Sequence, residues 1–225
     1  MKLLALDTST EACSVALVID GHCEERFALA PREHATLVLA MAEDLLAGAN
    51  LGLAQLDALA FGRGPGAFTG VRIGVGVAQG LAFGAGLPLV PVSTLAALAH
   101  TAWRVHGAAK VVAALDARMG EVYWANCTVS GEGNVVVEAE RVSHPSDVTV
   151  SGENWFGAGS GWATYAAMLS EQLGVALGAV DAKLYPHAQD VAALGLCAFA
   201  AGVRVAPAQA QPVYLRDQVT HKGNS

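Results

Sequence analysis

The chain has 225 residues, of which 53% are hydrophobic and 15% charged, so it can bury a sizeable core and is not a disordered polar tail. Its 20 acidic and 13 basic residues give a formal charge of −7. This excess of acidic residues argues against a protein that binds nucleic acid without a partner, because phosphate neutralisation needs clustered lysine and arginine. The four cysteines are scattered, and the first residues lack the pattern of a signal peptide, so we expect a cytoplasmic protein.

The first half of the chain predicts the order βββαβαβα. Strands are expected at 2–7, 13–19, 23–29, 56–61 and 88–91, and helices at 34–47, 70–85 and 93–105. Thr69 is expected to cap the helix at 70–85, and Ser93 or Thr94 the helix at 93–105. The stretch 73–90 is almost wholly apolar, but its five glycines and Pro88 favour a buried soluble segment, and no membrane contact is expected.

The second half predicts the same order in shortened form. Strands are expected at 111–115, 122–127 and 135–137 and at a short segment ending at Phe156, and helices at 162–173 and 188–201.

Two literal repeats support an internal duplication. Ala5-Leu6-Asp7 recurs as Ala114-Leu115-Asp116, and Phe61-Gly62-x-Gly64-x-Gly66 recurs as Phe156-Gly157-x-Gly159-x-Gly161. We therefore predict an α/β protein of two lobes, 1–105 and 106–225. Strand-end aspartates and glycine turns would face one another across a cleft, where ligands of such folds tend to bind.

The tetrad Asp7-Thr8-Ser9-Thr10 has two interpretations. A carboxylate followed by three hydroxyls could hold a hydrated cation and phosphate oxygens. The same side chains could instead satisfy the backbone of their own tight turn. At the repeat position, Asp116 is followed by Ala117 and Arg118, which places a cation where a metal-bound phosphate would lie.

The glycine-rich turn 62–70 enters a helix, as phosphate loops do, but it lacks the GK[ST] ending and the GxGxxG pattern, so a structural role is favoured. Within that helix Gly76, Gly80 and Gly84 leave one face almost without side chains. Each glycine costs about 1 kcal/mol of helix propensity relative to alanine, so something should compensate. Packing within the lobe and docking of a second chain are two alternative explanations of this glycine stripe.

Catalytic and metal-binding patterns are missing from the sequence. There is no HExxH, and the nearest histidines, His100 and His106, are separated by five residues, which does not put both on one helical face. No GxSxG elbow is present for a serine nucleophile. The sequence therefore indicates no convincing catalytic constellation.

Four segments together resemble the bacterial TsaB family, also called YeaZ. They are Leu4 to Leu17 (LALDTSTEACSVAL), Gly62 to Gly74 (GRGPGAFTGVRIG), Asp116-Ala117-Arg118 followed by Glu121-Val122-Tyr123, and Gln211 to Arg216 (QPVYLR). The similarity covers most of the chain. Ala67 departs from the family, which usually has serine there, so no hydroxyl can act at this position.

The resemblance implies an actin-like (ASKHA) fold and a non-catalytic subunit of the machinery that makes threonylcarbamoyladenosine in tRNA. The catalytic TsaD-like subunit would form a heterodimer with it, and a TsaE-like ATPase would join them. Alone, the chain would form a homodimer, and it would contact tRNA only indirectly. Helices of the first lobe form the dimer surface in such proteins, which implies an interface containing Leu37, Met41, Leu45, Arg72, Gly76, Gln79, Gly80 and Phe83.

No tightly bound cofactor is expected. Weak binding of ATP or ADP with Mg²⁺ is expected at most, either at the partner interface or in the cleft. The residues that would bind it in the cleft are Asp7, Thr8, Ser9, Thr10, Asp116 and Arg118. An alternative function is a free-standing ATP-dependent phosphotransferase or hydrolase that uses Asp7 and Asp116 across the cleft.

Overall fold

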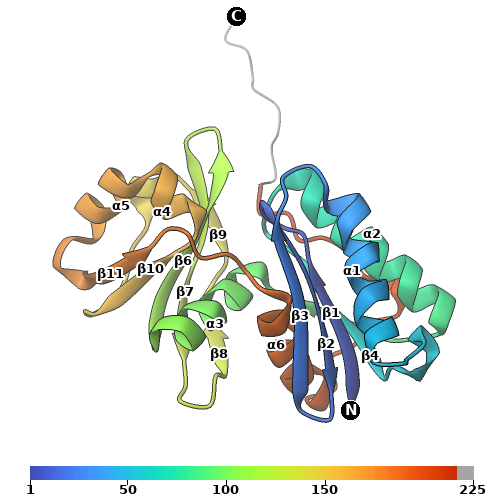
Figure 1. Cartoon of the computed structure of the whole chain (residues 1–225). Coiled ribbons are helices and arrows are strands. Elements are labelled where there is room, and N and C mark those ends of the chain that lie inside the picture. Colours follow the sequence, from blue (N-terminus) through green and yellow to red (C-terminus); the bar gives the residue numbers. More distant parts are fainter. Residues whose placement is uncertain (217–225) are drawn as a thin grey trace, which may run out of the picture.

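The first lobe of the computed structural model, which describes residues 1–216, is a five-stranded sheet with helices on both faces (Figure 1). Its strands are β1 (Lys2–Asp7), β2 (Ala12–Ile19), β3 (His22–Leu29), β4 (Ala58–Gly62) and β5 (Leu89–Val92). Its helices are α1 (His34–Gly48), α2 (Phe68–Ala85) and α3 (Thr94–His106). The strand order is β3-β2-β1-β4-β5, with β1 to β3 antiparallel and with β4 and β5 parallel to β1.

The second lobe repeats this plan. Its strands are β6 (Lys110–Arg118), β7 (Glu121–Val129), β8 (Val135–Val137), β9 (Arg141–Ser143), β10 (Trp155–Ala158) and β11 (Leu177–Asp181). Its helices are α4 (Ser160–Thr164), α5 (Ala166–Leu173) and α6 (Ala188–Ala200). The order β11-β10-β6-β7-β8 mirrors the first sheet, with the same parallel and antiparallel pairs, so the predicted duplication is confirmed.

Alternation along the strands places apolar side chains on both faces of each sheet. Leu4 and Leu6 of β1 pack towards α1 and α2, whereas Leu3 and Ala5 pack towards α6. In β6 the same alternation divides the side chains between the α3 side and the α4 and α5 side. The molecule is therefore layered, with α3 and α6 between the two sheets and the other helices outside (Figure 1).

The lobe boundary predicted at residue 105 needs a correction. α3 packs on the second sheet through Leu95 and Leu98, and α6 packs on the first sheet through Val191 and Ala192. The last helix of each half thus covers the sheet of the other half. A sheet with two apolar faces needs a helix on each, and the halves exchange these helices to provide them.

Several element boundaries also differ from the sequence prediction. α2 begins at Phe68 after Ala67, so Thr69 lies inside the helix and does not cap it, whereas Ser93 caps α3 by accepting from the Ala96 amide at 3.1 Å. The helix predicted at 162–173 is two helices that meet at Tyr165. The strands β9 and β11 were not predicted. Within residues 1–216, no helix combines the length and apolar character needed to cross a membrane.

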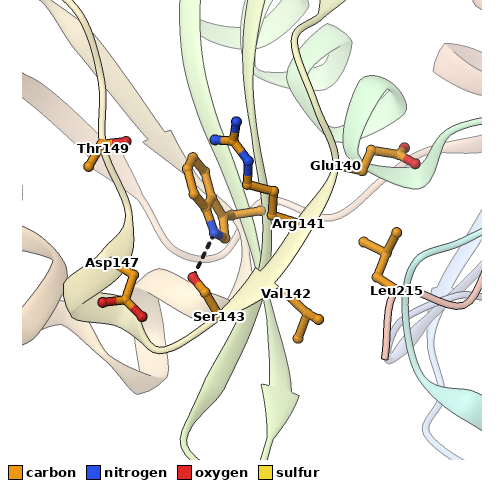
Figure 2. Close-up of a pocket in the computed structure, with 8 residues that line it drawn as sticks. Glu140, Arg141, Val142, Ser143, Asp147, Thr149 and Leu215 are labelled. Carbon is orange, nitrogen blue, oxygen red and sulfur yellow. Dashed lines mark hydrogen bonds between the residues drawn. The ribbon is translucent and has the colours of Figure 1, made fainter. Parts of the chain in front are cut away.

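The lobes are joined at the glycine turn after β4. Glu140, from the second lobe, accepts hydrogen bonds from Arg63 at 3.0 Å and from the Ser93 hydroxyl. The C-terminal segment crosses here as well, because the Val213 amide donates to the Arg63 carbonyl at 2.9 Å. An open groove beside this junction is lined by Glu140, Arg141, Val142 and Leu215, among others (Figure 2).

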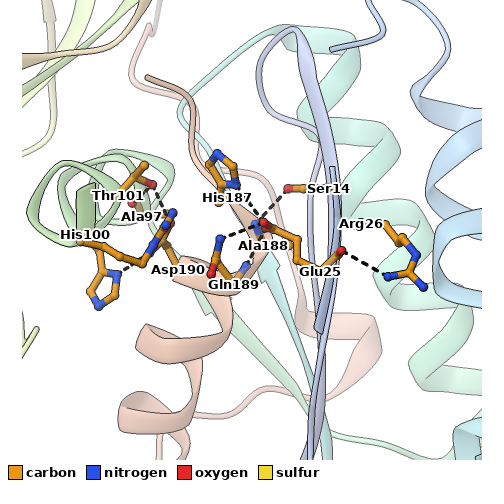
Figure 3. A network of polar contacts seen from close by, with 11 residues as sticks. Ser14, Glu25, Arg26, Ala97, His100, Thr101, His187, Ala188, Gln189 and Asp190 are labelled. Carbon is orange, nitrogen blue, oxygen red and sulfur yellow. Dashed lines mark hydrogen bonds and ion pairs between the residues drawn. The ribbon is translucent and has the colours of Figure 1, made fainter. Parts of the chain in front are cut away.

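The central layer is held together by a buried carboxylate, Asp190 of α6. It accepts two hydrogen bonds from Arg104, at 2.9 and 2.8 Å, and others from His100 and Thr101, all on α3 (Figure 3). Burial raises the pKa of Asp190, but the hydrogen bonds from Arg104, His100 and Thr101 outweigh it, so the pKa lies below its ordinary value. This carboxylate therefore couples α6 to α3.

Replacing Arg104 with methionine should destabilise the protein by about 3–5 kcal/mol at pH 7, because Asp190 would stay buried with too few partners. A depressed pKa contributes stability above the ordinary carboxyl range and loses it as pH falls. The loss of stability caused by Arg104→Met should therefore become smaller towards pH 4, where the Asp190 carboxyl can protonate. Urea unfolding across this pH range measures the effect.

Arg26→Met, which removes exposed ion pairs with Glu24 and Asp44, is the control, and its free energy of unfolding should change little. An equal loss in both variants would contradict this account.

Candidate functional site

The turn between β1 and β2 is buried beneath the start of α2. Asp7, Thr8 and Ser9 are each 1% exposed. The Asp7 Oδ1 accepts from the Ser9 amide at 2.9 Å and from the Ser9 hydroxyl at 2.7 Å, and the Thr8 hydroxyl donates to the Gly70 carbonyl at 2.7 Å. The contacts between Asp7 and Ser9 are those of an Asx turn, whereas the Thr8 hydroxyl binds the backbone of α2.

Glycines bring the backbone of the segment 62–74 directly against this turn. A Cβ on Gly62 would lie 1.8 Å from the Asp7 Oδ2, and one on Gly70 would lie 2.1 Å from the Thr8 carbonyl oxygen. Gly66 and Gly74 approach the turn in the same way. Only glycine permits this packing. The backbone of the segment 62–74 therefore lies in direct contact with the turn Asp7–Thr10.

Burial raises the pKa of Asp7 to about 6, although its hydrogen bonds from Ser9 lower it. Its Oδ2 has no hydrogen-bond partner among the residues that the structure describes. The buried Oδ2 packs against Gly62 and does not face the cleft. The phosphotransferase alternative needs this carboxylate at a substrate, and the observed geometry offers it no support.

Asp116 occupies the matching position in the second lobe but is more accessible. It accepts from the Arg118 amide at 2.8 Å and pairs with the Arg118 guanidinium at 3.0 Å. Arg118 also reaches Glu11 of the first lobe at 3.7 Å. The backbone here is strained, because Arg118 and Met119 have φ of 63° and 58°. The two hairpins thus meet through an arginine between carboxylates.

A cavity of about 760 Å³ lies where the hairpins, the start of α2 and the C-terminal segment converge. Of the residues predicted to bind a nucleotide, Ser9, Thr10, Asp116 and Arg118 line it, whereas Asp7 and Thr8 do not. Sequence reasoning did not identify the contributions of Tyr123 and Tyr214. Tyr214 belongs to the C-terminal segment, and its return to the cleft could not be read from local patterns.

The second candidate surface is the outer face of α1 and α2. A Cβ on Gly76, Gly80 or Gly84 would meet nothing within 4 Å, so packing within the lobe does not explain this stripe. Phe83 is 82% exposed beside it, and Leu39 of α1 is also exposed. In Figure 1 both helices lie outside the first sheet, on the side away from the second lobe. An apolar helical face with so few side chains permits close approach of another helix.

The interface prediction is corrected at several positions. Leu45 is fully buried in the core of the first lobe, and Leu37 and Met41 are half-buried against it. The apolar stripe of α1 is used by the lobe's own sheet, and its exposed residues include Leu39, Ala40 and Glu43 instead. The side chain of Gln79 is also engaged, because its amide donates to the carbonyls of Pro207 and Ala210. Arg72, Gly76, Gly80 and Phe83 are exposed, and their place in a partner interface stays a prediction.

Three of the four thiols, those of Cys13, Cys23 and Cys127, are poorly suited to nucleophilic chemistry. Burial raises the pKa of Cys13 to about 11 and that of Cys127 to about 12, so neither ionises near neutral pH. Burial also raises the pKa of the Cys23 thiol. Among residues 1–216, no three His, Cys, Asp or Glu side chains are grouped so that they could hold a metal ion.

Known proteins resemble this chain along nearly its whole length. A family model described as TsaD, tRNA N6-adenosine threonylcarbamoyltransferase, matches residues 28–222. The chain is 46% identical to the tRNA threonylcarbamoyladenosine biosynthesis protein TsaB of Escherichia coli K12, over 99% of this chain and 97% of that protein. It is 42% identical to TsaB of Haemophilus influenzae, over 99% and 96%. The solved structure of YeaZ from Pseudomonas aeruginosa is 49% identical, with a TM-score of 0.89 over 95% of this chain and 99% of that one.

Two alanine substitutions in α2 should have opposite effects on stability. Gly80→Ala should stabilise the fold by about 0.5–1 kcal/mol, because the added methyl meets open space and helix propensity improves. Gly70→Ala should destabilise it by more than about 2 kcal/mol, because the methyl would collide with the Thr8 carbonyl. Thermal and urea unfolding of both variants test this, and effects of the same sign would contradict the assignment of inner and outer faces.

Asp7→Asn should gain stability relative to the natural chain as the pH rises. Because the folded-state pKa is raised, the folded protein binds more protons than the unfolded chain between about pH 4 and 6. The free energy of unfolding therefore falls across this range, by about 3 kcal/mol at most for this group. Asparagine removes that contribution. Unfolding titrations at pH 4 and pH 7 give the difference, and a constant offset between the two proteins would show that Asp7 ionises normally.

Proposed function

Because the chain belongs to the TsaB family of tRNA threonylcarbamoyladenosine biosynthesis proteins, we propose that it is a non-catalytic subunit that docks a TsaD-like threonylcarbamoyltransferase through the outer face of α1 and α2. The observation that carries this proposal is the open space beyond Gly76, Gly80 and Gly84. Three glycines in a helix cost about 3 kcal/mol of helix propensity relative to alanine. Close contact with a partner helix is a physical reason to keep them.

The composition of the face supports a protein partner. Phe83 exposes an aromatic ring beside the glycines, and α2 carries only one charged side chain, Arg72. A large exposed aromatic group next to a bare backbone offers apolar contact area at close range. Within the described part of the second lobe, 106–216, the α1 helix has no counterpart, so this face is a feature of the first lobe. The same face would form the homodimer when the chain is alone.

The non-catalytic role rests on how the cleft groups are used. Asp7 is occupied by its own turn, and Asp116 is paired with Arg118. Transfer chemistry would then belong to the partner, and the chain itself would need no tightly bound cofactor. A net charge of −7 favours indirect contact with tRNA. The proposal places the chain in the cytoplasm, with a TsaE-like ATPase as a third component.

Gly80→Leu should weaken association with a TsaD-like partner at least tenfold while the isolated chain stays folded. The leucine side chain would occupy the space that the partner's backbone needs. Gly131→Leu is the matched control, because that glycine is also exposed with nothing near its Cβ but lies in the second lobe. Sedimentation velocity of the mixtures measures association.

Reconstituted threonylcarbamoylation of tRNA gives a second readout. Activity should fall with Gly80→Leu and be retained with Gly131→Leu at subunit concentrations near the natural dissociation constant. Unchanged sedimentation and activity in Gly80→Leu would remove α2 from the docking surface. Full activity with this chain omitted would overturn its role as a required subunit.

A further inference from the structure

The C-terminal segment, residues 205–216, contacts both lobes. Val205 exchanges two backbone hydrogen bonds with Leu89 of β5, at 2.9 and 2.8 Å, and so extends the edge of the first sheet. Ala210 is 3% exposed and belongs to the core that α2 covers. The packing of the first lobe therefore accounts for the course of the segment as far as Ala210, but not for residues 211–216, which continue to the second lobe.

A side chain of α2 holds the first part of this segment. The Gln79 amide donates to the Pro207 carbonyl at 3.1 Å and to the Ala210 carbonyl at 2.9 Å. Both hydrogens of the amide group are thereby used. Gln79 lies between Gly76 and Gly80 in the sequence, so this contact is next to the bare outer face of α2. A shift of α2 at this position would move the segment with it.

A side chain of the segment holds its other end against the β6–β7 hairpin. The Arg216 guanidinium pairs with the Glu121 carboxylate, and its Nη2 donates to the Ala117 carbonyl at 3.2 Å. Its Nη1 lies 3.6 Å from the Met119 sulfur. Guanidinium can make several such contacts at once, because its five N–H donors form a rigid planar fork. One arginine thus contacts both strands of the hairpin and its tip.

The tip of this hairpin has a strained backbone. Arg118 and Met119 have φ of 63° and 58°, and residues with side chains persist in this left-handed region only where neighbouring contacts hold them. Arg118 also reaches Glu11 of the first lobe at 3.7 Å. Relaxation of the tip would therefore move Arg118 away from the first lobe.

We propose that the C-terminal segment is a strap that couples α2 to the tip of the β6–β7 hairpin. Gln79 and Arg216 hold its two ends, and the tip is the two-state element, strained while Arg216 holds it and relaxed when Arg216 is released. A change at the outer face of α2 would then alter the tip, and the reverse also holds, because coupling between two sites is reciprocal. The strap does not depend on the docking function, because the isolated chain contains every residue invoked.

Hydrogen exchange of the backbone amides of residues 116–122, measured by NMR on the full chain, tests the proposal. Arg216→Met releases the tip and should speed exchange there at least tenfold. Gln79→Ala should speed exchange of the same amides at least threefold, although both hydrogen bonds of Gln79 are to the segment. Gln55→Ala is the matched control, because the Gln55 side chain accepts from the nearby Gly52 amide at 2.8 Å and should leave the tip unchanged.

A double variant distinguishes a strap from two independent losses. In an Arg216→Met background, Gln79→Ala should speed exchange at the tip by less than a further 1.5-fold, because the connection is already broken. Thermal unfolding confirms that the variants fold, and the amides of β2 report any general loss of protection. Unchanged exchange at the tip in either single variant would overturn the proposal. An undiminished effect of Gln79→Ala in the double variant, or equal acceleration in β2 and at the tip, would overturn it as well.

Discussion

The structure depends on the contact between the glycine-rich segment 62–74 and the turn Asp7–Thr10. Backbone packs on backbone here, so the start of α2 has one position relative to β1. The same contact buries the Asp7 carboxylate and uses the Thr8 and Ser9 hydroxyls, which removes the groups that a metal-bound phosphate would need. One contact therefore both fixes the start of α2 and buries the polar groups of the turn. The second lobe repeats this constraint, because Gly159 and Gly161 pack against Ala114 of β6.

A second consequence follows from the spacing of glycines in α2. Gly70 and Gly74 face the buried turn, whereas Gly76, Gly80 and Gly84 face open space. Moving from Gly74 to Gly76 turns the helix by about 200°, so the two sets lie on different sides. One helix thus carries an inner face that fixes it to the sheet and an outer face that can accept a neighbour. A substitution in either set acts on only one of these contacts, which makes fold and association separable by mutation.

The sequence was sufficient to predict most strands and the duplication, because the continuous apolar runs of β1 and β6 and the repeated glycine motif report local geometry directly. β11 was missed, since Gly178 and Ala179 give it little strand character and it is largely exposed. The position of α6 on the first sheet depends on contacts between residues far apart in the sequence, so local sequence patterns do not predict it. Leu45 was assigned to a partner surface for a related reason. An apolar helical stripe does not reveal whether its own sheet or another chain will cover it, and here the sheet does.

The two lobes kept the same sheet but diverged outside it, and this difference determines what each can do. In the first lobe α1 and the 18-residue α2 cover the sheet and still leave a bare outer face. In the second lobe α4 and α5 have 5 and 8 residues, and Trp162 fills the space beside Gly157. The bare outer helical face described for α2 therefore has no equivalent on α4 and α5, which are too short to provide one. The cleft between the lobes is also affected, because Arg118, which lines it, is paired with carboxylates from both lobes. The Arg118 guanidinium therefore links the two hairpins across the cleft.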